Sequence, residues 1–288
     1  MIPSAFDYVR PASIAEAQAA LASAVKTDAA ILAGGQSLLT ALKQRRRRPS
    51  LVIDLRGIAE LRDVTVKRGT MHVGAMVRQA DIVRHPFVRK YLRVLAEAGE
   101  AAGDPMIRRL GTLAGAFCEV DPEGDWVAAG LVLDVKVEKR GQRSSETIPL
   151  EQFVLGPHEV QLGAGEIVTS LEIPALPPRV RSAYRKAKHI AVGTSIASAA
   201  VVYCPDERGS CTWVRIAVAG APSYPQRLSD IEEALAGADF ADIASVSESV
   251  RDGMAGLEFI GDRYASADYR AERLAVLIQR TLTELAAD

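Results

Sequence analysis

Cysteine and histidine are scarce in this sequence, and each scarcity argues against a class of site. The three cysteines form no C-x-x-C pair, so the chain lacks the thiolates that an iron–sulfur cluster of its own would require. Their odd number suits a reducing cytoplasm, where thiols stay free. The four histidines show no H-E-x-x-H spacing, and we therefore expect no metal site. Any redox chemistry here needs an organic cofactor.

Net charge and long apolar runs are missing as well. The formal net charge of -1 is far from the basic footprint of a nucleic-acid-binding protein. No apolar run approaches the ~18 residues that span a bilayer, and the opening MIPSAFDYVRPAS lacks the pattern of a signal peptide. We therefore expect a cytoplasmic protein without a membrane span. Its 288 residues suffice for two or three domains.

The first 57 residues predict a small α/β unit. An amphipathic helix is expected over 12–25, with Ser13 as its N-cap. AAILAGG then reads as a short strand that runs into two glycines, QSLLTALKQR as a helix, and LVIDL at 51–55 as a second buried strand.

The rest of the chain predicts a mixed unit and then a separate α+β unit. Strand-like runs turn at Lys67–Gly69 and near Gly141, and another strand is expected at 167–173. In the last third, two strand regions flank the polar turn PDERGS. Helices are expected at 75–86, 87–103, 229–236 and 266–286. The prolines near 177 mark a boundary.

Two glycine-bearing turns stand out, AGGQSL at 33–38 and GTLAGAF at 111–117. Either could be only a tight turn. Alternatively, glycines let the backbone approach an anion, to which free N–H groups and a helix N-terminus then point. Neither turn matches G-x-x-x-x-G-K-[ST] or G-x-G-x-x-G. Together, two such turns in separate subdomains could hold a long dinucleotide from both sides.

The sequence around these turns resembles the medium, FAD-carrying subunit of molybdenum hydroxylases, the family of aerobic carbon monoxide dehydrogenase and xanthine dehydrogenase. AGGQSLLTALKQRRRRPSLVIDLRGI is similar to the first flavin-binding loop of that family, and IRRLGTLAGAFCEVDPEGDW to the second. FDYVRPASIAEA, GAGEIVTSLEIP and SADYRAERLA are also typical of it. The resemblance covers essentially the whole chain in the expected order.

This resemblance implies an FAD site and its residues. The first loop would wrap the diphosphate and ribityl region, the second would close over it, and Asp125 and Lys186 would lie near the flavin end. The implied cofactor-binding residues are Ala33, Gly34, Gly35, Gln36, Ser37, Leu38, Thr112, Leu113, Ala114, Gly115, Ala116, Asp125 and Lys186. No residue is expected to act as a catalytic acid, base or nucleophile, because the flavin carries the chemistry.

Several positions depart from the family pattern. The second glycine pair is Ala114–Gly115, and the Asn or Ser after it is Ala116, which could cost about 0.5–1.5 kcal/mol through a lost hydrogen bond. A family histidine aligns with Glu119, whose negative charge Arg109 is expected to offset. In the last domain, a family aspartate aligns with Gly193 and an arginine with His189.

The remaining charged and thiol groups are expected to have structural rather than catalytic roles. The run Arg45–Arg48 is expected to be a solvated helix C-terminus, with an acidic partner or nucleic acid as the alternative. Cys204 and Cys211 flank a turn and are expected to be free thiols. The carboxylates Asp121, Glu123 and Asp125 fit no EF-hand spacing, so loop capping or flavin contact is expected instead.

The predicted fold is α+β, a two-subdomain FAD-binding clasp of the PCMH or vanillyl-alcohol-oxidase type followed by an α+β C-terminal domain. The expected boundaries are 1–57, 58–177 and 178–288. The resemblance implies an electron-transfer subunit. It would receive electrons from a small subunit with [2Fe–2S] clusters, beside a large molybdopterin subunit, within a dimer of heterotrimers. A stand-alone flavoenzyme, or a non-enzymatic member with a degraded flavin site, remains the alternative.

Overall fold

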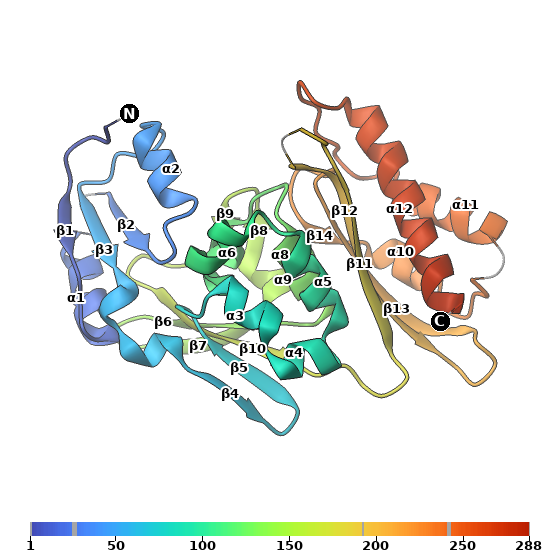
Figure 1. Cartoon of the computed structure of the whole chain (residues 1–288), viewed down its shortest axis with the longest axis horizontal. Helices are drawn as coiled ribbons and strands as arrows, with labels where there is room; N and C mark the ends of the chain where they lie inside the picture. Colours follow the sequence, from blue (N-terminus) through green and yellow to red (C-terminus); the bar gives the residue numbers. More distant parts are fainter. Residues whose placement is uncertain (1, 25–27, 192, 241–242, 288) are drawn as a thin grey trace.

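The computed structural model describes residues 2–24, 28–191, 193–240 and 243–287. Three larger sheets follow one another along the chain, and helices pack on each of them (Figure 1). In the view of Figure 1 the first sheet lies at the left, the second in the middle and the third at the right. The predicted α+β class is confirmed.

The first sheet is parallel and carries the first glycine turn at its edge. Its strands are β1 (Asp7–Val9), β2 (Ala29–Leu32) and β3 (Leu51–Asp54), in the order β1-β3-β2. The helices are α1 (Ile14–Ser23) and α2 (Leu38–Lys43), followed by the 3₁₀ turns η1 (Leu55–Gly57) and η2 (Ala59–Arg62). Because parallel strands end at one edge, the turn after β2 lies beside the end of β3.

The second sheet is antiparallel and collects strands that are far apart in sequence. Its order is β4-β5-β10-β6-β7, and β8 and β9 form a separate pair. The strands are β4 (Val64–Lys67), β5 (Thr70–Gly74), β6 (Lys136–Arg140), β7 (Ser145–Pro149), β8 (Val154–Gly156), β9 (Glu159–Val160) and β10 (Ile167–Pro174). The helices are α3 (Gln79–Arg84), α4 (Pro86–Tyr91), α5 (Arg93–Ala101), α6 (Pro105–Leu110), α7 (Leu113–Glu119), α8 (Asp125–Val132) and α9 (Leu150–Phe153).

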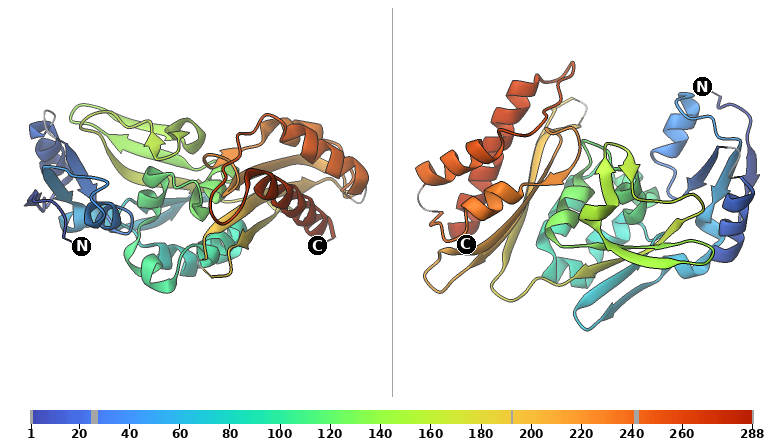
Figure 2. Two further views of the ribbon diagram at one scale, coloured as in Figure 1. Left: turned by 90° about the horizontal axis from the view of Figure 1, so that it is seen from above. Right: turned by 180° about the vertical axis from the view of Figure 1, so that it is seen from behind.

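The third sheet is antiparallel and has helices on both faces. Its strands, in order, are β11 (Arg181–Lys188), β12 (Ser195–Pro205), β13 (Cys211–Ala219) and β14 (Gln226–Arg227). The helices that follow are α10 (Ser229–Ala234), α11 (Ile243–Gly253) and α12 (Ala267–Ala287). These cover the outer face, while α5 and α8 of the second region lie against the inner face (Figure 2).

Burial on the inner face joins the third sheet to the rest of the molecule. Tyr184, Ala200, Val202 and Ala217 belong to the same buried cluster as the second region, not to the cluster under α10–α12. Apolar area removed from water stabilises by about 25 cal/mol per Å². The C-terminal region is therefore held to α5 and α8 by an apolar interface.

The structure corrects three secondary-structure predictions. The helix expected over 87–103 is two helices, broken at Leu92, whose backbone is not helical. The second glycine turn is largely the first part of α7, which begins at Leu113. The pattern also missed α11, whose serines and acidic residues favour loops; it forms because Val246 and Val250, one turn apart, are buried in the C-terminal core.

Candidate functional site

The two glycine turns touch each other through their backbones. A Cβ atom on Gly34 would lie 2.5 Å from the carbonyl oxygen of Leu110, 2.7 Å from the Cα of Gly111 and 3.0 Å from the nitrogen of Thr112. No real side chain tolerates such contacts with main-chain atoms, so this position requires glycine. The structure thus brings the turns predicted near residues 34 and 115 together.

The first turn presents backbone donors that nothing in the described part of the chain accepts. The N–H groups of Gly35, Gln36 and Ser37 donate no hydrogen bond there. Gly35 has a φ of 76°, in the left-handed region that glycine adopts without strain. The carbonyls of Gly35 and Ser37 accept the first bonds of α2. At the N-terminus of a helix the carbonyls accept helical hydrogen bonds, but the N–H groups have no acceptor within the helix. Three successive N–H groups are therefore left for a ligand.

The two ends of the first turn are anchored. Ala33 and Gly34 are half-buried after β2, and Leu38 packs with Leu42 and Val52 in a small core of the first region. The Gln36 amide bonds back to the carbonyl of Gly34 at 3.2 Å. The turn is thus held partly by contacts within the first region.

The second turn satisfies most of its own donors. The Thr112 hydroxyl caps α7 by accepting from the N–H of Gly115 at 3.0 Å, and the Thr112 carbonyl accepts from Ala116 at 3.2 Å. The N–H of Leu113 donates to the carbonyl of Val77 at 3.3 Å. In the ranges that the structure describes, the N–H groups of Thr112 and Ala114 are the donors of this turn without a partner.

Asp125 and Lys186, both predicted at the flavin end, form a buried ion pair with each other. The Lys186 Nζ lies 2.9 Å from each carboxylate oxygen of Asp125, and the side chains are 8% and 5% exposed. The Tyr184 hydroxyl also donates to Asp125. Burial raises the pKa of Asp125, and the charge of Lys186 and the Tyr184 hydrogen bond offset only part of this rise. The pair joins the start of α8 to β11.

Glu119 links the two turns across the site. Burial raises its pKa; the charge of His158, a hydrogen bond with the Ser37 hydroxyl, and the charge of Arg46 act in the opposite direction. The His158 Nδ1 lies 3.4 Å from the Glu119 carboxylate. The expected compensation by Arg109 is not found: Arg109 is exposed on α6, and the groups that lower the pKa of Glu119 are His158, Ser37 and Arg46.

One buried carboxylate lies beside the first turn. Asp54, at the end of β3, is fully buried and accepts hydrogen bonds from the Tyr8 hydroxyl at 2.6 Å and from the Arg56 backbone N–H and guanidinium. Burial alone would raise the pKa of Asp54, but the bonds from Arg56 and Tyr8 outweigh it and lower the pKa. This local cluster fixes the end of β3, where Asp54 pairs with Leu32, the last residue of β2 before the first turn.

Apolar side chains are exposed around the site. Met106 and Leu110 on α6 are 66% and 51% exposed, Ile107 is 38% exposed, and Leu39 on α2 is 41% exposed. α6 ends at the carbonyl that contacts Gly34. These side chains therefore lie beside the meeting point of the turns and are open to a partner.

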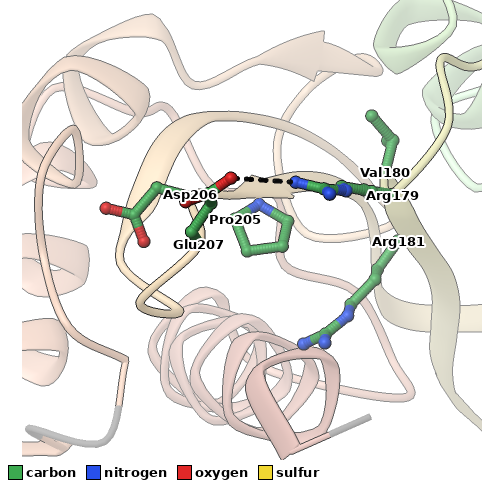
Figure 3. A pocket seen from close by; sticks show the side chains of 6 residues that line it. All are labelled: Arg179, Val180, Arg181, Pro205, Asp206 and Glu207. Carbon is green, nitrogen blue, oxygen red and sulfur yellow. Dashed lines mark ion pairs between the residues drawn. The ribbon is translucent and has the colours of Figure 1, made fainter.

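Features elsewhere carry no chemistry of their own. A surface hollow of about 590 Å³ lies between the start of β11 and the turn after β12 (Figure 3). Among the residues described, no group of histidine, cysteine or acidic side chains could hold a metal ion, and no helix is long and apolar enough to cross a membrane. The three cysteines are free thiols, and the exposed run Arg45–Arg48 follows the end of α2, as predicted.

Sequence patterns missed several contributors to the site. Tyr184 precedes Lys186 by two residues on a strand, so period-two alternation could have placed both on one face. Leu110 contributes a carbonyl oxygen, and no side-chain pattern signals a main-chain contact. The Ser37–Glu119 contact joins residues in separate elements and had no signal in one sequence.

Comparison with protein families finds two matches that together span nearly the whole chain. Residues 4–176 match the FAD binding domain in molybdopterin dehydrogenase, and residues 182–285 match the CO dehydrogenase flavoprotein C-terminal domain. The first match alone covers more than half of the chain, and it contains both glycine turns.

Individual proteins are similar over the same extent. The nicotine 6-hydroxylase medium subunit of Paenarthrobacter nicotinovorans is 36% identical over 98% of each chain. The carbon monoxide dehydrogenase medium chain of Hydrogenophaga pseudoflava is 30% identical over 98% of this chain and 97% of its own. A structure of carbon monoxide dehydrogenase from that organism superposes with a TM-score of 0.93 and 30% identity, over 100% of this chain and 99% of the other. The structure of quinoline 2-oxidoreductase from Pseudomonas putida 86 superposes with a TM-score of 0.91 and 26% identity, over 100% of this chain and 99% of the other.

Proposed function

The chain belongs to the family of FAD-binding medium subunits of molybdenum hydroxylases, as its motifs predicted, and on this premise we propose that it binds FAD between its two glycine turns. In this role it is the electron-transfer subunit of a heteromeric dehydrogenase. The observation that carries the proposal is the backbone contact at Gly34, with free N–H groups directly beside it.

The residues present fit the cofactor. A dinucleotide diphosphate needs closely spaced donors on a backbone that can approach it, and Gly35, Gln36 and Ser37 offer three successive N–H groups. Ala114 offers one from the second turn. When bound, FAD supplies the electron-transfer chemistry, and the protein supplies binding, orientation and electrostatics.

Asp125 and Lys186 act in this proposal as a neutral, rigid pair at the flavin end of the site. Because both side chains are buried and joined by two contacts of 2.9 Å, each holds the other in place. Their role is to present hydrogen-bonding groups in a fixed orientation. No described residue is proposed as a catalytic acid, base or nucleophile.

The partners that we propose are a small [2Fe–2S] subunit and a large molybdopterin subunit, assembled as a dimer of heterotrimers. Similar proteins carry names that state a subunit role, such as medium subunit and medium chain. The exposed Met106, Ile107 and Leu110 support a partner close to the flavin, since an exposed apolar cluster marks an interaction site.

Location and domain division are also proposals. A cytoplasmic location is supported by the three free cysteines. The division into 1–57, 58–177 and 178–288 is supported by the three sheets, each of which lies within one of these segments.

A stand-alone flavoenzyme would need a substrate cavity over the flavin. Two hollows that the described residues form lie elsewhere: one beside β11, the other, of about 150 Å³, on the second sheet near Glu138 and Ser170. Neither is lined by a residue of the glycine turns. We favour the subunit role because similar proteins named as a medium subunit and a medium chain match this chain over nearly its whole length.

Affinity purification from the native host tests this proposal. The tagged chain should co-elute with a protein that carries iron and sulfide and with one that carries molybdenum, together with about one flavin per chain. Substrate of the isolated complex should bleach the flavin absorption. A chain that elutes alone with bound flavin would indicate a stand-alone enzyme, and elution alone without flavin would contradict both functions.

A further inference from the structure

Arg270, in the first part of α12, is completely buried although it carries a charge. Its Nη1 donates to the carbonyl oxygens of Ser195 at 2.9 Å and Ile196 at 3.2 Å, and also to that of Gly220. These carbonyls lie at the start of β12 and just after the end of β13. One side of the guanidinium therefore fixes two strand ends of the third sheet.

The other side of the guanidinium faces carboxylates. The Arg270 Nη2 lies 2.8 Å from Asp262 and 3.5 Å from Glu123. Glu123 is in the loop before α8, two residues from Asp125, and therefore belongs to the flavin side of the molecule. Burial raises the pKa of Glu123, and the nearby charge of Arg270 opposes that rise.

A second contact joins the same two places. The backbone N–H of Gly220 donates to the carbonyl of Pro122 at 2.7 Å, while the Gly220 carbonyl accepts from Arg270. Gly220 has a φ of 81°, and a Cβ there would lie 2.5 Å from the Ser195 hydroxyl. The loop 121–124 is thus tied to the third sheet by one backbone bond and one ion pair, both organised around Arg270.

We propose that Arg270 is a positioning residue that sets the orientation of the loop 121–124 and, through it, the placement of the Asp125–Lys186 pair. Its planar fork reaches carbonyls on one side and carboxylates on the other, a geometry that the single ammonium of lysine cannot reproduce. α12 thereby controls the flavin end of the site from the far face of the third sheet. The effect on flavin binding rests on the proposed function; the control of loop geometry does not.

A purely structural role would make Arg270 one more anchor of α12, and Arg181 offers the matched control. Arg181, on β11, donates to the carbonyls of Leu285 at 2.7 Å and Ala286 at 3.1 Å, at the opposite end of α12. Its guanidinium points toward that helix (Figure 3). Loss of either arginine loosens α12, but only Arg270 contacts the loop.

The experiment compares Arg270→Lys, Glu123→Gln and Arg181→Lys in the full-length chain. Trp126, which is buried beside Asp125, reports loop geometry without any flavin when Trp213 is replaced by Phe in every protein. Arg270→Lys and Glu123→Gln should each shift the Trp126 emission and weaken FAD binding by about tenfold, with a double variant no worse than Arg270→Lys alone. Arg181→Lys should lower the melting temperature and leave both readouts unchanged.

The opposite pattern would overturn the proposal. If Arg270→Lys lowers the melting temperature but leaves Trp126 emission unchanged, or if Arg181→Lys shifts it equally, Arg270 is only an anchor. Should Arg270→Lys fail to fold, Glu123→Gln carries the same test, because it removes one charge from a half-buried side chain. Failure of the unaltered chain to bind FAD would contradict the proposed function, and the Trp126 comparison would still decide the positioning role.

Discussion

The two sides of the proposed flavin site are held by different kinds of contact. On the N-terminal side, Gly34 meets Leu110 and Gly111 through main-chain atoms, with no room for a side chain. On the C-terminal side, Asp125 and Lys186 meet through buried charges. A backbone contact tolerates no added volume, whereas an ion pair tolerates no missing partner. The comparison teaches that the two sides of the proposed site are sensitive to opposite kinds of substitution.

The largest effect should come from added volume on the N-terminal side. Gly34→Val would drive carbon atoms into the Leu110 carbonyl, and overpacking of this kind costs about 1–3 kcal/mol or more. We expect the turns to separate and FAD binding to be lost, as measured by thermal unfolding and FAD titration. Gly256→Val is the control, because no atom lies within 4 Å of a Cβ there. Unchanged flavin affinity in Gly34→Val would place the cofactor elsewhere.

Loss of one charge should have the next largest effect, on the C-terminal side. Lys186→Met leaves the buried Asp125 carboxylate without its cation, which costs about 3 kcal/mol of unfolding free energy. The loss should shrink as pH falls, because protonation of Asp125 removes the unpaired charge. Urea unfolding across pH measures both. Adding Asp125→Asn to Lys186→Met should recover part of the loss; a purely additive double variant would argue against a direct pair.

Removal of the helix N-cap at Thr112, on the N-terminal side, should have a smaller effect on the free energy of unfolding. Thr112→Ala removes the oxygen that accepts from the Gly115 N–H, and loss of such an N-cap costs about 1 kcal/mol. Thr112→Ser keeps the oxygen and should behave like the unaltered chain in chemical unfolding. If the two variants were equally unstable, the methyl group rather than the cap would matter.

Asp54 gives the smallest predicted effect, one of pH dependence. Its folded-state pKa lies below its ordinary value, so its ionised form stabilises the fold above about pH 4, and this contribution is lost as pH falls through the folded-state pKa. The gap in unfolding free energy between the unaltered chain and Asp54→Asn should therefore close in acid. A gap of constant size from pH 7 to pH 3 would show that charge plays no part.

The same contrast explains what the sequence could predict. The first glycine turn and its strand–helix–strand unit were predictable, because Gly34, Gly35 and the apolar strands are local signals. The break at Leu92 and the helix α11 were not, because tertiary packing rather than propensity determines them.

The candidate site divides in the same way. Asp125 and Lys186 could each be named from the family resemblance, but not as partners, since 61 residues separate them. The arginine that organises the loop before Asp125 lies 145 positions further on, and only the fold brings it near. Local chemistry can be read from sequence, whereas long-range charge pairs depend on how sheets and helices assemble.

The most direct test of the central claim is the visible absorption spectrum of the purified chain after incubation with FAD and gel filtration. The account predicts flavin bands that co-elute with the protein at about one FAD per chain, and that disappear in Gly34→Val but not in Gly256→Val. A colourless protein that ignores added FAD would contradict it, and would mean that Glu119 and the other departures from the family pattern have abolished the site.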